Sequence, residues 1–225
     1  MNNSPLSADD CKIFSAKSQL YCYVPITKVA STYLFRALPA QSFDIHNWCW
    51  IQNSELPPHP SQVRYLVVLR DPLERWISGA VEFWCRARPD RDWNLITEDS
   101  DIFDQIEFDV HTRPQIDFLH CIDRTQTTWL YMNHSVENHP WFAANNVKLR
   151  DVDNQDRNWG NARPQIYFFE DQRLYAPIPG AVASTPSAII QKNLRRVIDT
   201  SARCRDKIVK YYQQDFELIQ SVDFS

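Results

Sequence analysis

The sequence predicts an α/β fold in which helices cover both faces of a parallel sheet. Short runs of apolar, aromatic and β-branched residues predict buried strands, and two of these runs pass directly into segments of helical periodicity. Such alternation of strand and helix is typical of parallel sheets. A length of 225 residues suits one domain, so we expect residues 1–225 to form a single domain.

The N-terminal part of the chain contains three expected elements. Residues 1–18 are polar and lack clear periodicity, which predicts an irregular leader. Residues 20–26 have the sequence LYCYVPI, which predicts a buried strand. Residues 31–38 carry apolar side chains at helical spacing, so we expect a helix that Ser31 or its neighbour caps and Pro39 ends.

The strongest strand prediction is the continuous apolar run at residues 65–70, YLVVLR. Asp71-Pro72 follows it and predicts a helix start, with aspartate as cap and proline at the first helical position. We expect this helix to end before Pro89. Its expected apolar face consists of Trp76, Ile77, Ala80, Val81 and Trp84.

The rest of the chain alternates shorter and less regular signals. In chain order, we expect a helix at 102–108, a strand at 127–132, a surface excursion at 133–164, a strand at 165–170, a helix at 186–199 and a last helix near 203–219.

Charge and glycine content exclude several classes of function. The chain has 24 Lys and Arg against 28 Asp and Glu, a net charge of −4, which disfavours a broad nucleic-acid or anionic-membrane surface but permits a local cationic pocket. With glycine only at Gly79, Gly160 and Gly180, neither a G-x-G-x-x-G loop nor a complete G-x-x-x-x-G-K-[ST] loop is present.

Other absences bear on location, redox state and metals. The six cysteines are scattered without a C-x-x-C pair, so we expect mostly buried thiols rather than disulfides. No signal-peptide pattern and no apolar run of about 18 residues occurs, so we expect a cytoplasmic protein without a membrane span. No H-E-x-x-H motif or carboxylate triplet occurs, so we expect no metal site.

The first strand-to-helix junction combines a cation with hydroxyl groups. Lys28, Ser31 and Thr32 lie where residues 20–26 lead into the next helix. Backbone N–H groups at a helix start favour an anion, and the lysine adds a full positive charge. An ordinary helix cap beside a surface lysine is the alternative interpretation.

The second junction places Arg70 at the end of the apolar strand and Ser78 eight residues later on the following helix. A guanidinium at the carboxyl edge of a sheet suits bidentate phosphate binding, and we expect Ser78 to hold the same phosphate from the helix flank. Alternatively, Arg70 or Arg75 pairs with Glu74 or Asp71 on a solvated helix start.

These two junctions resemble the donor-binding motifs of the sulfotransferases that use 3′-phosphoadenosine 5′-phosphosulfate (PAPS). Residues 26–32, ITKVAST, are similar to the loop that binds the 5′-phosphosulfate, and residues 67–78, VVLRDPLERWIS, resemble the 3′-phosphate motif. Thr27 replaces the family's usual proline, and Ala30 occupies its glycine position. Three further segments are similar to the carbohydrate (Golgi-type, family 2-like) members, so the resemblance covers about residues 20–220; they are 109–115, 169–171 and 211–218.

The resemblance implies a P-loop-nucleotide-kinase-like sulfotransferase fold and transfer of a sulfuryl group from PAPS to a carbohydrate-like hydroxyl, with PAP as product and no metal. It implies that Lys28 stabilises the leaving phosphate oxygen and that Arg70 and Ser78 bind the 3′-phosphate. The implied 5′-phosphosulfate-binding residues are Lys28, Val29, Ala30, Ser31 and Thr32.

The acceptor hydroxyl also needs a general base. The stretch between the two motifs offers His46, Glu55 and His59, and we expect His46 because imidazole titrates near neutrality and two tryptophans flank it. His111 and Glu55 are the alternatives. The competing function is a catalytically silent module that binds PAP or another nucleotide; a kinase is disfavoured because the loop lacks triphosphate-wrapping glycines.

Overall fold

The computed structural model describes residues 12–39, 63–87, 95–108, 111–120, 122–133, 136–152 and 186–225. The chain divides into two compact units. The described residues of the first unit belong to Met1–Asp71, Pro114–Val152 and Gln214–Ser225, and those of the second to Pro72–Arg113 and Asp153–Gln213. The single domain over residues 1–225 stays a prediction.

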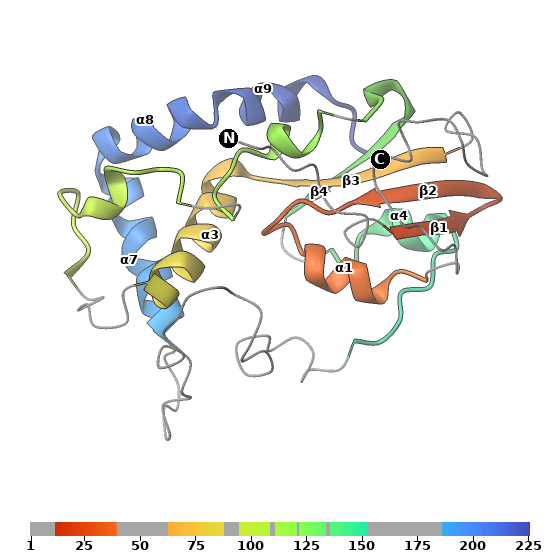
Figure 1. Cartoon of the computed structure of the whole chain (residues 1–225), viewed down its shortest axis with the longest axis horizontal. Helices are drawn as coiled ribbons and strands as arrows, with labels where there is room; N and C mark the ends of the chain where they lie inside the picture. The colour runs from red at the N-terminus through yellow and green to blue at the C-terminus, as the bar shows by residue number, and fades with distance from the viewer. Residues whose placement is uncertain are drawn as a thin grey trace. The chain divides into compact units, whose positions relative to one another are not determined.

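The first unit is built on a mixed sheet. Its described strands are β1 (Lys12–Ala16), β2 (Gln19–Val24), β3 (Val63–Arg70) and β4 (Thr127–Met132), side by side in that order (Figure 1). β1 pairs antiparallel with β2, whereas β2 with β3 and β3 with β4 are parallel. The prediction of an α/β protein with parallel strands is therefore confirmed, and the antiparallel first pair is an addition to it.

Strand β1 corrects the prediction of an irregular leader for residues 12–16, whereas residues 1–11 of that leader lie outside the described residues. Ile13, Phe14 and Ala16 are buried, and the Phe14 ring stacks on Tyr21 of β2 with 5.7 Å between centroids. The turn between β1 and β2 is Lys17-Ser18, and both residues have positive φ, as a tight hairpin turn requires. The usual Asn-Gly signal for such a turn is absent, which explains why sequence reasoning missed the strand.

Both faces of the central strands are covered. Four consecutive residues of β2, from Tyr21 to Val24, and five of β3, from Tyr65 to Leu69, are buried. In Figure 1, α1 (Ser31–Ala37) is seen below the strands and α9 (Gln213–Ser221) above them, while α4 (Pro140–Ala144) overlaps β1 in this view. The burial of side chains on alternate faces is what the continuous apolar run of β3 predicts.

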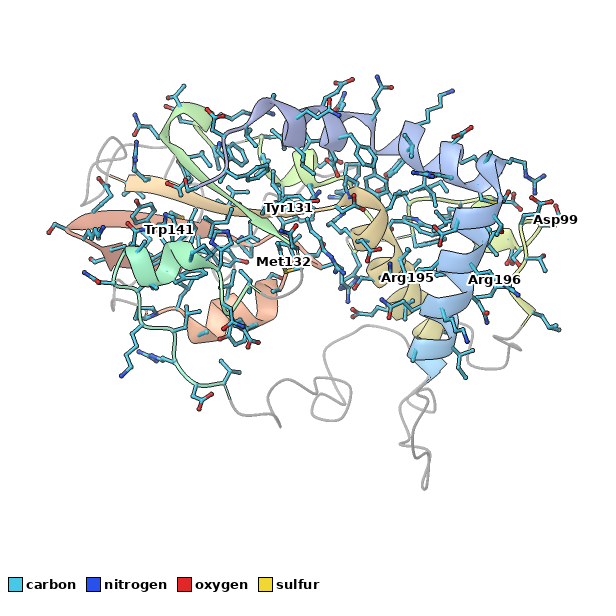
Figure 2. All side chains as sticks on the ribbon, turned by 180° about the vertical axis from the view of Figure 1, so that it is seen from behind. Asp99, Tyr131, Met132, Trp141, Arg195 and Arg196 are labelled. Atoms are coloured by element: carbon cyan, nitrogen blue, oxygen red, sulfur yellow. The ribbon has the colours of Figure 1, made fainter. Side chains whose placement is uncertain are left out.

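The described part of the expected surface excursion at 133–164, residues 136–152, carries exposed side chains but is also anchored to the core, which the prediction did not include. Trp141, labelled in Figure 2, lies edge-on to Phe14 and Tyr21, with centroids 6.5 and 5.2 Å away. Val136, Phe142 and Val147 are buried as well. Several apolar side chains within a polar stretch are enough to anchor it to the sheet.

The second unit is helical in the part that the structure describes. α3 (Pro72–Ala87), α7 (Pro186–Thr200) and α8 (Ala202–Tyr211) pack against one another, and Arg195 of α7 forms an ion pair with Glu74 of α3. The predicted helices after Asp71 and over 186–199 are confirmed. On the expected apolar face of α3, Trp76, Ile77 and Ala80 are buried and Val81 is half-buried; the Trp84 side chain lies outside the described residues.

Two helix predictions differ from the structure. Only the 3₁₀ turn η4 (Asp101–Phe103) forms within the expected helix at 102–108, because Phe103 and Phe108 are spaced to stack on Trp76 and Phe83 of α3 instead. The last helix is divided into α8 and α9 at Tyr212. Two further 3₁₀ turns are η5 (Gln115–Phe118) and η6 (Arg124–Gln126). The predicted strand at 127–132 is confirmed as β4. The expected strand at 165–170 lies outside the described residues.

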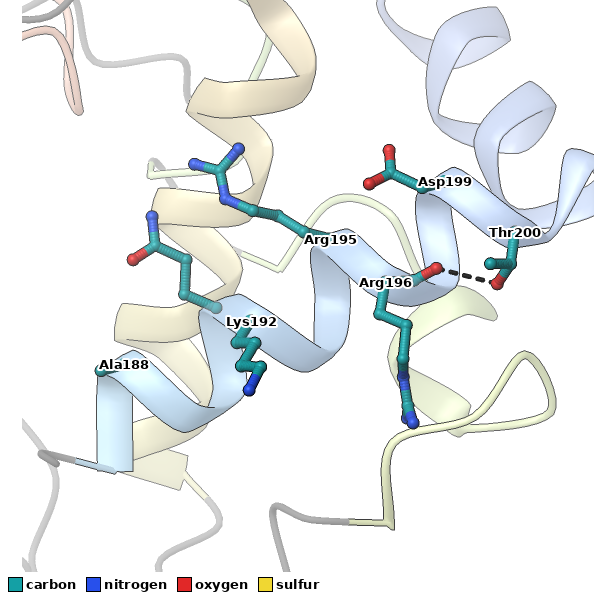
Figure 3. Close-up of a pocket in the computed structure, with 7 residues that line it drawn as sticks. Ala188, Lys192, Arg195, Arg196, Asp199 and Thr200 are labelled. Carbon is teal, nitrogen blue, oxygen red and sulfur yellow. Dashed lines mark hydrogen bonds between the residues drawn. The ribbon is translucent and has the colours of Figure 1, made fainter.

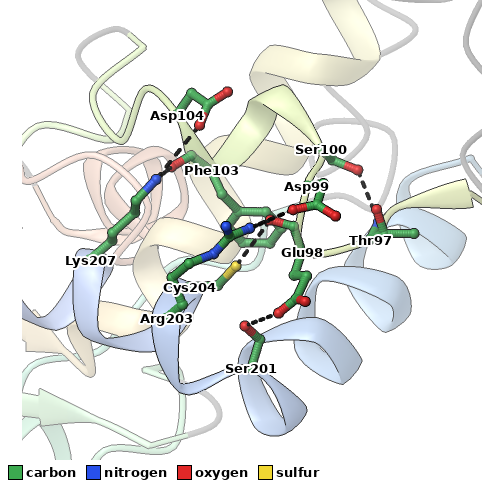
Figure 4. A network of polar contacts seen from close by, with 10 residues as sticks. All are labelled: Thr97, Glu98, Asp99, Ser100, Phe103, Asp104, Ser201, Arg203, Cys204 and Lys207. Carbon is green, nitrogen blue, oxygen red and sulfur yellow. Dashed lines mark hydrogen bonds and ion pairs between the residues drawn. The ribbon is translucent and has the colours of Figure 1, made fainter.

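Polar contacts fasten the loop at 97–104 to α8 (Figure 4). Ser201 Oγ donates to Glu98 Oε2 at 2.7 Å, and Arg203 Nη2 donates to Asp99 Oδ1 at 2.8 Å. Lys207 Nζ donates to the carbonyl oxygen of Phe103 at 3.2 Å. The Arg203–Asp99 hydrogen bond raises the pKa of the Arg203 guanidinium above its ordinary value.

Two of the cysteines test the expectation of buried thiols. Cys22 and Cys204 are both free and buried, as expected. Among the helices that the structure describes, none combines the length and apolar content needed to cross a bilayer.

Gly79 marks a close approach between α3 and the segment at 111–112. A Cβ atom built at Gly79 clashes with the carbonyl oxygen of His111 and lies 2.9 Å from Cγ2 of Thr112. Helix propensity alone favours alanine over glycine by about 1 kcal/mol. We therefore expect Gly79→Ala to lower the free energy of unfolding by about 1–3 kcal/mol, the usual cost of overpacking, in chemical denaturation.

Ser78→Ala is the matched control, because it lies one residue earlier on α3 and adds no atoms. A Gly79→Ala protein more stable than the wild type would contradict the close approach.

Candidate functional site

The first junction is the loop between β2 and α1. Lys28 has φ 66°, and Ala30 adopts the left-handed conformation with φ 59° and ψ 25°. Ala30, the residue before Ser31, is the N-cap of α1 and Ser31 is the first helical residue, so the neighbour of Ser31 holds the cap position but supplies no side-chain cap. An alanine N-cap has no side-chain oxygen, so no side chain caps the first turn.

This loop geometry suits an anion. A left-handed residue followed by a right-handed helical one turns successive backbone N–H groups toward a single concavity. Ala30 and Ser31 form such a pair, two residues after Lys28.

The second junction begins at Arg70, the last residue of β3, and α3 starts at Pro72 as predicted. Glu74 pairs with Arg195, and Arg75 is completely buried and donates to the carbonyl oxygen of Arg113. The alternative in which Arg75 occupies a solvated helix start is therefore wrong.

The first unit brings Lys28 and Arg70 together. Val24 pairs with Val67 in the parallel register, so the loop after β2 lies level with the end of β3. Arg70 Nη1 donates to the carbonyl oxygen of Lys28 at 3.2 Å. Two cationic residues from different segments are thus neighbours at the carboxyl edge of the sheet, where ligands of such sheets bind.

Gln115 holds the main chain of Arg70. The Arg70 N–H donates to Gln115 Oε1 at 3.0 Å, and Gln115 Nε2 donates to the carbonyl oxygen of Arg70 at 2.9 Å. Gln115 is itself completely buried.

Asp215 of α9 in turn holds Gln115. The backbone N–H groups of Gln115 and Ile116 donate to its two carboxylate oxygens at 2.7 and 2.8 Å, and Asp215 is completely buried. Both residues lie in segments that resemble the family, 109–115 and 211–218, but the sequence assigned neither of them a role. A carboxylate on the apolar face of the last helix, between Tyr212 and Ile219, is the signal that marks Asp215, because buried carboxylates require partners.

Ser78 and His111 belong to the second unit, whereas Lys28 and Arg70 belong to the first. Ser78 is half-buried on α3. His111 Nε2 lies 3.6 Å from Glu82 Oε1, which is an ion pair only when the imidazole is protonated. The expected base His46 and its alternative Glu55 lie outside the described residues, as does the side chain of Thr32.

A shallow hollow on α7 is a weaker candidate (Figure 3). All of its lining residues lie on that one helix, between Ala188 and Thr200. Its arginines already bind protein groups, since Arg195 pairs with Glu74 and Arg196 Nη2 donates to the carbonyl oxygen of Ile96 at 3.0 Å. Neither Lys28 nor Arg70 lines this hollow.

The described residues contain no group of three or more His, Cys, Asp or Glu side chains that could hold a metal ion. Comparisons of the chain with protein-family models, curated proteins and solved structures find no match.

The conformation of Ala30 allows a stability test. Left-handed backbone costs an L-residue about 1–2 kcal/mol, and the extra freedom of glycine in the unfolded chain costs about 0.4–1 kcal/mol. We therefore expect Ala30→Gly to leave the free energy of unfolding unchanged or to raise it by up to about 1.6 kcal/mol, measured by denaturant titration.

The control is Ala80→Gly, at a buried position in the middle of α3, which we expect to destabilise by about 1 kcal/mol or more. If the two substitutions destabilise equally, Ala30 is not left-handed in solution.

Proposed function

We propose that this chain is a sulfotransferase that moves the sulfuryl group of PAPS to a hydroxyl of a carbohydrate-like acceptor. The proposal includes the P-loop-nucleotide-kinase-like fold that the motif resemblance implies. Its support is the order and spacing of the two motifs, together with the position of Lys28 and Arg70 in the first unit.

The observation that carries the proposal is the hydrogen bond from the Arg70 guanidinium to the main chain of Lys28. A nucleotide with phosphates at its 5′ and 3′ positions needs two cationic groups at neighbouring points. Lys28 and Arg70 are suited to this role because Arg70 ends β3 and Lys28 lies in the loop that follows the neighbouring parallel strand β2. A guanidinium carries five N–H donors, so one bond to a carbonyl is compatible with phosphate binding by the same group.

In the proposed reaction, the acceptor oxygen attacks sulfur as the bond from sulfur to the 5′-phosphate oxygen breaks in line. Negative charge develops on the leaving phosphate oxygen, and the Lys28 ammonium stabilises it together with backbone N–H groups of the loop. The acceptor proton passes to a general base, for which His46 is the first candidate. Arg70 and Ser78 select the donor through its 3′-phosphate.

Nucleotide binding tests the donor assignment. By calorimetry, we expect the wild type to bind PAP more tightly than ADP, which lacks a 3′-phosphate. Hydrogen bonds to charged groups contribute about 1.5–3 kcal/mol, so Arg70→Ala is expected to weaken PAP binding by about 10- to 100-fold.

The matched control is Arg64→Ala, because Arg64 is an exposed arginine on the same strand. We expect it to leave the PAP affinity unchanged. Equal affinity of the wild-type protein for PAP and ADP would remove the donor assignment.

Sulfate transfer tests the enzymatic assignment. With PAPS carrying labelled sulfate and a glycan array as acceptor pool, we expect labelled glycans from the wild type. We expect His46→Ala to lower turnover by about 10²–10⁴-fold, the usual size of a general-base loss, while PAP binding stays intact.

The control is His120→Ala, since the side chain of His120 is 70% exposed. Unchanged turnover in His46→Ala, with loss in His111→Ala or Glu55→Gln, would transfer the role of base to that residue. PAP binding without transfer to any glycan would favour the catalytically silent module.

A further inference from the structure

We infer that Gln115 and Asp215 are positioning residues that aim the Arg70 guanidinium at the 3′-phosphate, and that donor selectivity depends on them. The inference rests on the proposed function, since it takes Arg70 as the 3′-phosphate ligand. It assigns a role to two residues that lie in neither phosphate motif.

The Gln115 carboxamide occupies the place of a strand residue. It presents one acceptor and one donor side by side, and both are used by the N–H and carbonyl groups of Arg70, at 3.0 and 2.9 Å. A neighbouring strand offers a backbone the same pair of groups. Gln115 therefore fixes the main chain of Arg70, from which the guanidinium extends.

The two hydrogen bonds from the Gln115 side chain to the Arg70 main chain, here called the Gln115 clamp, are needed because of the position of Arg70. Arg70 ends β3, three residues beyond Val67, whose partner Val24 is the last residue of β2. Arg70 is therefore paired on one side only, with Met132 of β4, and a terminal strand residue held on one side is prone to fraying. An arginine on a moving main chain loses the geometry that bidentate phosphate binding requires, and displacements of about 1 Å are costly in such sites.

Asp215 fixes the backbone at Gln115, the residue that forms the clamp. Its two carboxylate oxygens accept from the N–H groups of Gln115 and Ile116, and hydrogen bonds to an ionised acceptor are stronger than neutral ones. Asp215 and Gln115 are completely buried, which makes their hydrogen bonds costly to lose. The last helix is thereby linked to Arg70 through four hydrogen bonds, and Arg70 to Lys28 through a fifth.

A purely structural clamp is the competing explanation, and it makes a different prediction. If Gln115 and Asp215 only stabilise the fold, their loss lowers stability and weakens every nucleotide alike. If they position Arg70, their loss weakens only the contribution of the 3′-phosphate. PAP and AMP separate the two explanations, because these nucleotides differ by that phosphate alone.

The test uses the full chain with Gln115→Met, which keeps the side-chain length and removes both hydrogen bonds. By calorimetry, we expect PAP affinity to fall about tenfold or more while AMP affinity stays within about twofold of the wild type. In an Arg70→Ala background, Gln115→Met is expected to change PAP affinity no further, as a double-mutant cycle requires of residues acting through one another.

Two further variants keep the test decisive. Gln115→Glu preserves the acceptor for the Arg70 N–H but faces the Arg70 carbonyl with a second acceptor, and Asp215→Asn removes one of the two bonds to the loop. We expect both to lose PAP affinity selectively. Gln214→Met, at an exposed position beside Asp215, is the matched control and is expected to bind PAP as the wild type does.

The outcomes separate this inference from the proposed function. A wild type that binds PAP and AMP equally overturns the proposed function. A wild type that prefers PAP, with variants that keep this preference or lose both affinities equally, overturns the positioning role alone. Thermal melts accompany each measurement, and failure of Gln115→Met, Gln115→Glu and Asp215→Asn to fold assigns the pair a structural role instead.

Discussion

The parallel pairing of β2 with β3 is the constraint on which the candidate site depends. It brings together two segments that are 42 residues apart and lets the guanidinium of Arg70 donate to the carbonyl oxygen of Lys28. Separately, each junction is a cation beside a helix start, a common and uninformative arrangement. Together they form one edge of a sheet with two positive charges at neighbouring strand ends, and this combination makes a doubly phosphorylated nucleotide a chemically reasonable ligand.

Buried polar groups support this edge from within the first unit. Gln115 and Asp215 are completely buried, and such groups destabilise a fold unless their hydrogen bonds are satisfied. Here the Gln115 side chain bonds the main chain of Arg70, and the Asp215 carboxylate bonds the main chain of Gln115 and Ile116. An apolar pair of similar volume would stabilise the core at least as well in many contexts, so the polar pair is better explained by the orientation that it imposes.

The sequence predictions were correct where local interactions decide the secondary structure and wrong where contacts between distant residues decide it. β3, β4, α3 and α7 were predicted because their own side-chain periodicity and the Asp71-Pro72 signal decide them. β1 was missed because its turn, Lys17-Ser18, has left-handed backbone without the residues that usually signal it. The helix expected at 102–108 did not form, because the aromatic side chains there pack on α3. Long-range packing overrides a weak local pattern in such segments.

By itself, the sequence determined which charged residues lie where buried strands end, since residue type and local period place Arg70 at the end of one strand and Lys28 in the loop after another. Only the tertiary structure decided that these strands are neighbours and that Gln115 and Asp215 hold the second of them. Gln115 lies 45 residues from Arg70 and 100 residues from Asp215 along the chain, distances at which no local pattern specifies a partner. The physical reason is that hydrogen bonds between such residues form only when the whole unit packs, so their pairing is a property of the fold.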